Sequence, residues 1–381
     1  MKKILALSLI VTSILFSVFL ISSKKTYYNP ESFLLNSWKS YKKAYLYKDG
    51  RIIDPARNDS TISEGQSYAM LQSVWMNDKE TFDLVWDWTK TNLNRNQDNL
   101  LAWKWGKKQD GSYGFVEEGD QNSASDGDTD IALALIFAYK RWNDIKYLED
   151  AKNLLTDIWK YETVEVSKKR YLIAGNWAQD DNKIIINPSY FAPYAWRIFA
   201  KFDTQNDWNS LIDPAYELLE KTVIDKLDNK SASGLPPDWV AIDKNSGSLE
   251  ATGKPNMDTN YSYDALRIPW RVALDYQWNN EVRAKTYLLS AFDVLKNDYK
   301  STHKLAGSYT HDGSILISQE SPALYATSLG YFVMANKEIS KDIYKKKVLK
   351  LYATHLSYYD QNWLWFGYAL YNNKLINLAD E

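Results

Sequence analysis

Residues 124–142 read ASDGDTDIALALIFAYKRW, and this stretch decides the fold more directly than any other part of the sequence. From Asp128 to Trp142 apolar residues recur at helical spacing, which predicts an α-helix. Three acidic residues, Asp126, Asp128 and Asp130, stand at its start. One Asp suffices to cap a helix, so the cluster holds more charge than capping requires. The stretch therefore predicts a helix with a candidate site at its N-terminus.

The same helical spacing recurs along the rest of the chain, whereas strand-like alternation is short and local. This pattern predicts an all-α fold. We expect helices near Pro30 to Tyr47, Ser63 to Met76, Lys79 to Leu93, Asp128 to Trp142, Lys146 to Tyr161, Pro188 to Phe202, Gln205 to Leu227, Asn260 to Tyr276, Asn280 to Tyr299, Ser321 to Ala335, Ser340 to His355 and Gln361 to Tyr371.

The connections between these helices alternate between short turns and long loops. Short turns pair consecutive helices into hairpins, six in all. The long loops are rich in Gly, Asn, Asp and Trp and cover residues 93–125, 162–187, 227–259 and 300–320. This alternation predicts an (α/α)6 barrel of six helical hairpins with the long loops at one end, where binding and catalysis usually occur. A helical solenoid would require a sequence repeat, which is absent.

The composition narrows the class of ligand. A formal net charge of -2 argues against a nucleic acid or an anionic membrane surface as the main partner. The sequence has no Cys and only three His, so we expect no disulfide, no metal and no cofactor. Sixteen Trp and 28 Tyr favour a ligand with apolar ring faces, such as a sugar, although core packing also uses aromatic residues.

The N-terminus has the pattern of an export segment. Two Lys residues precede an uncharged apolar run over residues 4–21, and Lys24 and Lys25 follow it. The run is long for a signal peptide and lacks an Ala-x-Ala site, so residues 1–25 are interpreted as either a signal peptide or a membrane anchor. We expect residues 26–381 to form a single catalytic domain outside the cytoplasm, secreted or anchored to the outer face of the cytoplasmic membrane.

Two further carboxyl groups lie where a loop meets a predicted helix. Glu64 is in the first turn of its helix, after Ser63 and beside Gly65, which leaves room for close approach. It could simply complement the helix dipole, and an acid there needs burial or a nearby carboxylate to raise its pKa. Asp264 and Arg267 are three residues apart on one helical face, so an ion pair is expected, either in a site or on the surface. Glycoside hydrolysis requires two such carboxyl groups.

At these residues the sequence resembles glycoside hydrolase family 8. The family signature is filled by residues 124–128, 131–132, 134–136, 138 and 142. Other family-like segments follow in the expected order at residues 63–70, with Ala69 where Gly is usual, and at 187–193, 237–239, 263–271 and 358–360. The resemblance covers nearly all of residues 30–375 and implies an (α/α)6 barrel, an inverting mechanism and no metal.

The resemblance also implies roles for individual residues. Glu64 would protonate the glycosidic oxygen, Asp264 would activate the water, and Asp126 would bind and orient the sugar at the point of cleavage. Candidates for sugar contacts are Trp103, Trp105, Trp177, Tyr194, Trp239, Tyr263 and Arg267.

These roles predict an inverting endo-β-1,4-glucanase that acts on cellulose or a cellulose-like exopolysaccharide, in association with a cellulose or exopolysaccharide synthase system. The same chemistry would serve xylan, chitosan or another β-1,4-linked polymer, because loop shapes set specificity. A catalytically inactive glycan-binding protein is an alternative from a different class, and a helical adaptor would leave the acidic motifs unexplained.

Overall fold

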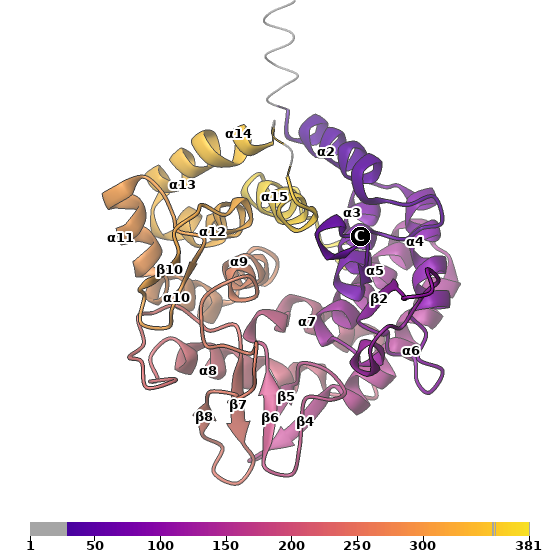
Figure 1. The fold of residues 1–381 in the computed structure, drawn as a ribbon, viewed down its shortest axis with the longest axis horizontal. Helices are drawn as coiled ribbons and strands as arrows, with labels where there is room; N and C mark the ends of the chain where they lie inside the picture. The colour runs from indigo at the N-terminus through magenta and orange to yellow at the C-terminus, as the bar shows by residue number, and fades with distance from the viewer. Residues whose placement is uncertain (1–28, 353, 355, 381) are drawn as a thin grey trace, which may run out of the picture.

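The computed structural model describes residues 29–352, 354 and 356–380, and the predicted export segment lies outside them. The helices form two concentric rings, which confirms the predicted (α/α)6 barrel (Figure 1). The inner ring contains α3 (Ser63–Trp75), α5 (Ser125–Trp142), α7 (Pro193–Phe202), α9 (Ile268–Asn279), α12 (Pro322–Ala335) and α15 (Tyr358–Tyr371). The outer helices are α2 (Pro30–Tyr45), α4 (Lys79–Asn92), α6 (Ile145–Tyr161), α8 (Ile212–Thr222), α10 (Val282–Ser290), α11 (Asp293–Thr302), α13 (Lys337–Ile343) and α14 (Leu349–Leu351).

The distribution of apolar residues explains which ring each helix joins. Inner helices are buried around most of their circumference: in α5 every residue from Ser125 to Ala138 is buried. Outer α6 buries only one face, which includes Tyr147, Leu154 and Ile158. A helix that is apolar all round must be enclosed, whereas an amphipathic helix can cover it. None of the helices in the described ranges is long and apolar enough to cross a membrane.

The pairing of helices differs from the prediction at one position. Five inner helices are each followed directly by an outer partner, but the sixth pair joins the two ends of the chain, α2 and α15. Trp365 Nε1 donates a hydrogen bond to the Leu34 carbonyl at 3.2 Å, and Phe33 stacks on Tyr368 with ring centroids 3.8 Å apart. The ring is therefore closed by contacts between α2 and α15, the first and last helices of the described ranges, rather than by a sixth hairpin.

Five predicted helices start late or break. The helix predicted from Gln205 begins at Ile212, after a 3-10 turn, and the one predicted over 340–355 is divided into α13 and α14 by a π-helical turn at Tyr344–Val348. The helix predicted from Pro188 begins at Pro193, because a 3-10 turn and two non-helical residues precede it. The helix predicted over 280–299 is two helices, α10 and α11, separated at Phe292, whose φ is +66°. The helix predicted from Asn260 begins at Ile268, so Asp264 lies in the turn before α9.

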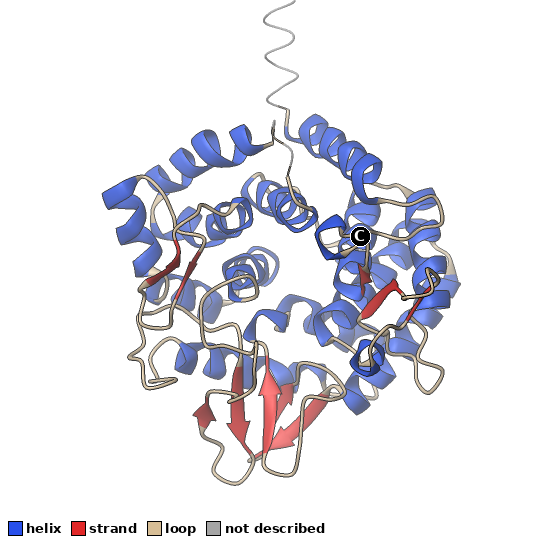
Figure 2. Cartoon of the chain, in the orientation of Figure 1, coloured by secondary structure: helices blue, strands red, loops and turns tan. Residues whose placement is uncertain are grey.

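Short antiparallel strands occupy the loops between the helices (Figure 2). Three of these sheets lie within the predicted long loops or continue from them, while the pairing β1-β2 joins the start of α3 to the 93–125 loop. The strands are β1 (Thr61–Ile62), β2 (Lys104–Lys107), β3 (Tyr113–Gly114), β4 (Thr163–Val166), β5 (Lys169–Leu172), β6 (Lys183–Ile186), β7 (Val240–Asp243), β8 (Leu249–Glu250), β9 (Ser308–Tyr309) and β10 (Ile315–Ile317). They pair as β1-β2-β3, β4-β5, β6-β7-β8 and β9-β10.

Glycines bring the inner helices close together where they begin. A Cβ on Gly127 would lie 2.6 Å from Ser63 Oγ, and a Cβ on Gly65 would lie 2.1 Å from the Tyr358 hydroxyl. No larger residue fits at either position without displacing its neighbour. The space predicted beside Glu64 is thus filled by Tyr358, and the N-termini of α3, α5 and α15 are held at one end of the barrel.

Candidate active site

A cleft of about 720 Å³ opens at this end of the barrel. Its walls come from the starts of α3, α5 and α15 and from the loops before α3, α5, α7 and α9. It is lined by Asp54, Arg57, Ile62, Ser63, Glu64, Trp103, Ala124, Asp126, Tyr190, Trp239, Asn256, Tyr263, Asp264, Ser357, Tyr358, Tyr359 and Asp360. The three carboxyl groups predicted from separate parts of the sequence, Glu64, Asp126 and Asp264, all face it.

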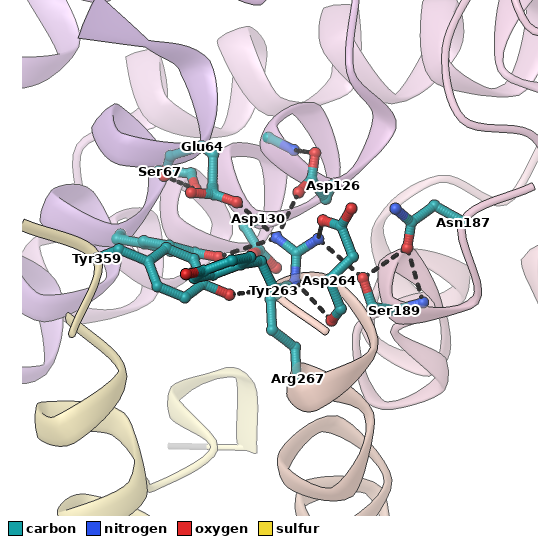
Figure 3. Close-up of polar contacts among 12 residues, drawn as sticks. Glu64, Ser67, Asp126, Asp130, Asn187, Ser189, Tyr263, Asp264, Arg267 and Tyr359 are labelled. Carbon is teal, nitrogen blue, oxygen red and sulfur yellow. Dashed lines mark hydrogen bonds and ion pairs between the residues drawn. The ribbon is translucent and has the colours of Figure 1, made fainter. Parts of the chain in front are cut away.

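One buried guanidinium connects these three carboxyl groups (Figure 3). Arg267 Nη1 donates to Glu64 Oε2 at 2.5 Å and to Asp126 Oδ2 at 3.1 Å. Its Nη2 donates to Asp264 Oδ1 and to Ser189 Oγ, the latter at 2.8 Å. The predicted Asp264–Arg267 ion pair is therefore present. Arg267 itself is buried and does not line the cleft, so it holds the carboxyl groups instead of making the sugar contact predicted for it. Glu64 and Asp264 contact different nitrogens of the same rigid group, which fixes their relative positions.

Burial and charge both act on the pKa of Glu64. Burial is the largest effect, and together with the charges of Asp126 and Asp264 it raises the pKa of Glu64 to about 7, against the opposing effects of Arg267 and Arg57. Burial also raises the pKa of Asp126. The balance is physically reasonable, because three carboxyl groups surround a single guanidinium. An acid at a helix N-terminus needs burial or a nearby carboxylate to raise its pKa, and Glu64 has both.

A second buried ion pair lies under the cleft and explains the position of Tyr194. Arg271 Nη1 and Nη2 donate to the two oxygens of Asp130 at 3.0 and 2.8 Å, and Nη1 also donates to the Tyr194 hydroxyl at 2.7 Å. Tyr194 is only 2% exposed and does not line the cleft. Tyr194 therefore packs inside the barrel, where it contacts Arg271, and it is not among the groups that could reach a sugar directly.

The predicted aromatic contacts separate into two groups. Trp103, Trp239 and Tyr263 line the cleft, and Tyr263 is 61% exposed. Trp105 does not line it, because its ring packs edge-on against Trp88 and Phe115.

Trp177 does not line the cleft, but it is partly buried and packs against Trp239, which does. Its ring centroid is 6.4 Å from that of Trp239, and its Nε1 donates to the Ser123 carbonyl at 3.2 Å. Trp177 therefore supports the Trp239 platform.

Sequence reasoning missed part of the cleft lining. Tyr190 and Tyr358 to Asp360 lie in segments that resemble the family. The resemblance is the signal that could have identified them as cleft residues, but it does not by itself give their roles. Asp54 and Arg57 lie at the two ends of a short 3-10 turn and Asn256 lies in a loop, and none of the three carried a signal in the sequence. In the described part of the chain no three His, Asp or Glu side chains are grouped so that they could hold a metal ion.

The family model of glycosyl hydrolases family 8 matches residues 5–373. The chain belongs to this family. The match extends over all six inner helices and includes Glu64, Asp126 and Asp264. In this family 8 glycosyl hydrolase, the three carboxyl groups predicted from the sequence therefore lie on the wall of a single cleft.

The family 8 chain is also similar to individual endoglucanases. It is 30% identical over 316 residues to Endoglucanase 2 of Ruminiclostridium josui, and this match covers 78% of this chain and 63% of the relative. It is 34% identical over 237 residues to an endoglucanase of Escherichia coli (strain K12), which covers 61% of this chain and 60% of the relative. The matches thus span less than two thirds of either relative. Among solved structures, an endo-1,4-D-glucanase from Vibrio fischeri ES114 superimposes with a TM-score of 0.75 at 25% identity and covers 89% of this chain and 95% of that one.

Proposed function

We propose that this chain is an inverting endo-β-1,4-glucanase that cleaves cellulose or a cellulose-like exopolysaccharide. The observation that carries the proposal is the pair Glu64 and Asp264, which face one cleft and are joined through Arg267. Glu64 acts as the general acid and Asp264 as the general base. The similarity to endoglucanases supports the choice of substrate class.

Glu64 is suited to donate a proton near neutral pH. Because its pKa is raised to about 7, about half of the enzyme retains the acidic proton at that pH. Its side chain is 16% exposed and borders the cleft, where it can protonate the oxygen of the leaving sugar. Proton transfer to that oxygen makes the departing alcohol a better leaving group.

Asp264 is suited to activate water. Its side chain is 28% exposed on the cleft wall and paired with Arg267, which orients it. In inversion the base takes a proton from a water molecule that attacks the anomeric carbon on the face opposite to the leaving group, so the two carboxyl groups stand about 6.5–9.5 Å apart. Here a guanidinium joins Glu64 to Asp264, which keeps the two groups from direct contact. Asp126 pairs with the same guanidinium and lines the cleft, which supports its proposed role in binding the sugar at the point of cleavage.

The aromatic lining favours a neutral polysaccharide. Trp103, Trp239 and Tyr263 offer ring faces and edges along the cleft, and sugar rings stack on such surfaces through their apolar faces. A substrate panel tests the choice. We expect the largest release of reducing ends from carboxymethylcellulose or mixed-linkage β-glucan, with a rapid fall in viscosity, and less from xylan and chitosan.

The outcome of the panel has a clear reading. A preference for xylan or chitosan would replace the proposed substrate, and failure to cleave any of the four polymers would support the inactive glycan-binding alternative. Binding of cello-oligosaccharides, measured by calorimetry, would then identify the ligand.

We further propose that the enzyme works outside the cytoplasm, tethered or exported through residues 4–21, next to a system that synthesises the polymer. The apolar run between paired Lys residues supports export. The catalytic domain should be found in the culture medium or be degraded when protease is added to cells stripped of their outer envelope, whereas protection of the domain until the cytoplasmic membrane is lysed would contradict this location.

A further inference from the structure

We propose that Asp238 is a positioning residue that holds the general base in place, an inference that rests on the proposed role of Asp264. Asp238 precedes β7 and is 6% exposed. Its carboxylate accepts four hydrogen bonds from residues 262–265. Residues 262–267, which include Asp264 and Arg267, are called the Asp264 turn below. Asp238 does not belong to that turn, and 26 residues separate it from Asp264.

The four hydrogen bonds leave little freedom for the turn. Asp238 Oδ1 accepts from the backbone N–H groups of Ser262 at 3.1 Å, Asp264 at 3.1 Å and Ala265 at 2.7 Å. Its Oδ2 accepts from Ser262 Oγ at 2.5 Å. A single carboxylate thus accepts from three backbone N–H groups that would otherwise have no hydrogen-bond partner at the start of a helical segment.

This arrangement resolves a conflict in the role of Asp264. Asp264 occupies the N-cap position of the 3-10 turn at Ala265–Arg267, and an N-cap Asp normally uses its own carboxylate to accept backbone N–H groups. The Asp264 side chain makes no such capping bond and points instead to Arg267 and the cleft. Asp238 supplies the acceptor that Asp264 does not, which leaves the Asp264 carboxylate available for water.

The backbone around Asp238 brings it to this position. The Asp238 N–H donates to the Asn260 carbonyl at 2.7 Å, and the Trp239 N–H donates to the Asp258 carbonyl at 3.1 Å. These bonds align the segment before β7 with the segment that enters the Asp264 turn. Trp239 follows directly and lines the cleft, so one short segment carries both an aromatic platform and the support of the base.

The acceptor oxygens of Asp238 matter more for this role than its charge. Burial and the nearby Asp264 charge raise the pKa of Asp238 to about 7, so a neutral side chain is compatible with the site near that pH. Asn retains one oxygen for the three backbone donors, and the Ser262 hydroxyl can rotate to accept from the Asn amide. Ala retains neither oxygen.

The test compares Asp238→Ala with Asp238→Asn. In Asp238→Ala the Asp264 side chain is free to turn back and cap its own helix, so we expect kcat on carboxymethylcellulose to fall about 10²-fold, the loss typical of a small misplacement of a catalytic group. KM should change less than about threefold, because Trp103 and Trp239 line the cleft outside the Asp264 turn, and Asp238→Asn should restore most of kcat.

Asp243 provides a matched control on the same segment. Its carboxylate also accepts backbone bonds in a turn, from Asn245 at 3.1 Å and Ser246 at 2.7 Å, but it does not line the cleft. Asp243→Ala should leave kcat within about twofold of the wild type. An equal loss of kcat in Asp243→Ala and Asp238→Ala would overturn the proposal.

A double variant distinguishes positioning from general damage. If Asp238 acts through Asp264, adding Asp238→Ala to Asp264→Asn should cause no further loss of kcat, whereas a further loss of about 10²-fold would overturn the proposal. If Asp238→Ala fails to fold, as judged by its melting temperature, Ser262→Ala serves in its place, with a smaller loss that Asp264→Asn should likewise mask. Full activity of Asp264→Asn alone would instead show that the proposed base is wrong.

Discussion

Replacing Glu64 by Gln is expected to lower kcat/KM on carboxymethylcellulose by about 10²–10⁴-fold, the usual contribution of a general acid. Gln keeps the size of the side chain and can accept a hydrogen bond from Arg267, but it has no acidic proton to give to the leaving sugar. The measurement is the initial rate of reducing-sugar release by purified enzyme. A loss of less than about threefold would contradict the assignment of Glu64 as the acid.

Glu162 is a suitable control for this substitution. It is buried like Glu64, and burial raises its pKa to about 8. It is absent from the cleft lining and accepts a hydrogen bond from Ser123 Oγ at 2.6 Å. Glu162→Gln should therefore alter stability more than catalysis, so its effect on kcat/KM separates loss of a buried carboxyl group from loss of the catalytic one.

The pH profile of the wild-type enzyme should show the same acid. Glu64 must be protonated to act, and its pKa is raised to about 7, so kcat/KM should be unaffected by this group well below pH 7 and should fall about tenfold per pH unit well above it. The residual activity of Glu64→Gln should lack this alkaline decline. A decline that persists unchanged in the variant would assign it to another group.

Replacing Asp264 by Asn is expected to lower kcat by about 10²–10⁴-fold with little change in KM. Asn can still accept the hydrogen bond from Arg267, but it cannot take a proton from the attacking water. Binding of cello-oligosaccharides by the inactive variant, measured by calorimetry, should match that of the wild type. Wild-type turnover in Asp264→Asn would contradict its role as base.

Asp54 offers the matched comparison for Asp264. It also lines the cleft and pairs with an arginine, since Arg57 Nε lies 3.5 Å from its Oδ2. It has no contact with Arg267. Asp54→Asn should affect KM more than kcat. Asp54 can touch a bound sugar, but it is not one of the three carboxyl groups that pair with Arg267.

Local patterns were sufficient for the parts of the site that lie within one helical turn. The spacing of Asp264 and Arg267 predicted their ion pair, and the acids at the start of α5 marked a site. Contacts between distant segments were not predictable in this way. Arg267 reaches Glu64 across 203 residues and Asp126 across 141, and only the closed ring of helices brings them together.

Aromatic residues show a second limit of the sequence. Composition indicated sugar platforms, but it could not tell a ring that faces the cleft from one that packs beneath it. Trp103 faces the cleft, whereas Tyr194 binds Arg271 in the interior and Trp105 packs on Phe115. The difference depends on which way each side chain points from its loop, strand or helix, and hydrophobicity does not record it.

Helix existence was easier to predict than helix ends and partners. The buried helices α5 and α12 have continuous apolar patterns and were located well. The break at Phe292 follows from backbone geometry without a strong local signal, whereas the start of α9 is marked by Pro269, a residue that favours the first turn of a helix. The pairing of α2 with α15 joins the chain ends, which no short-turn rule describes.

The configuration of the first product tests the central claim most directly. Proton NMR of fresh hydrolysate from a soluble β-1,4-glucan, recorded within seconds to minutes of enzyme addition and before mutarotation, reports the anomer that is released. Joint action of Glu64 and Asp264 on a bound water predicts that the new reducing end appears first as the α-anomer. Initial appearance of the β-anomer would contradict the account, because it would require a covalent glycosyl intermediate.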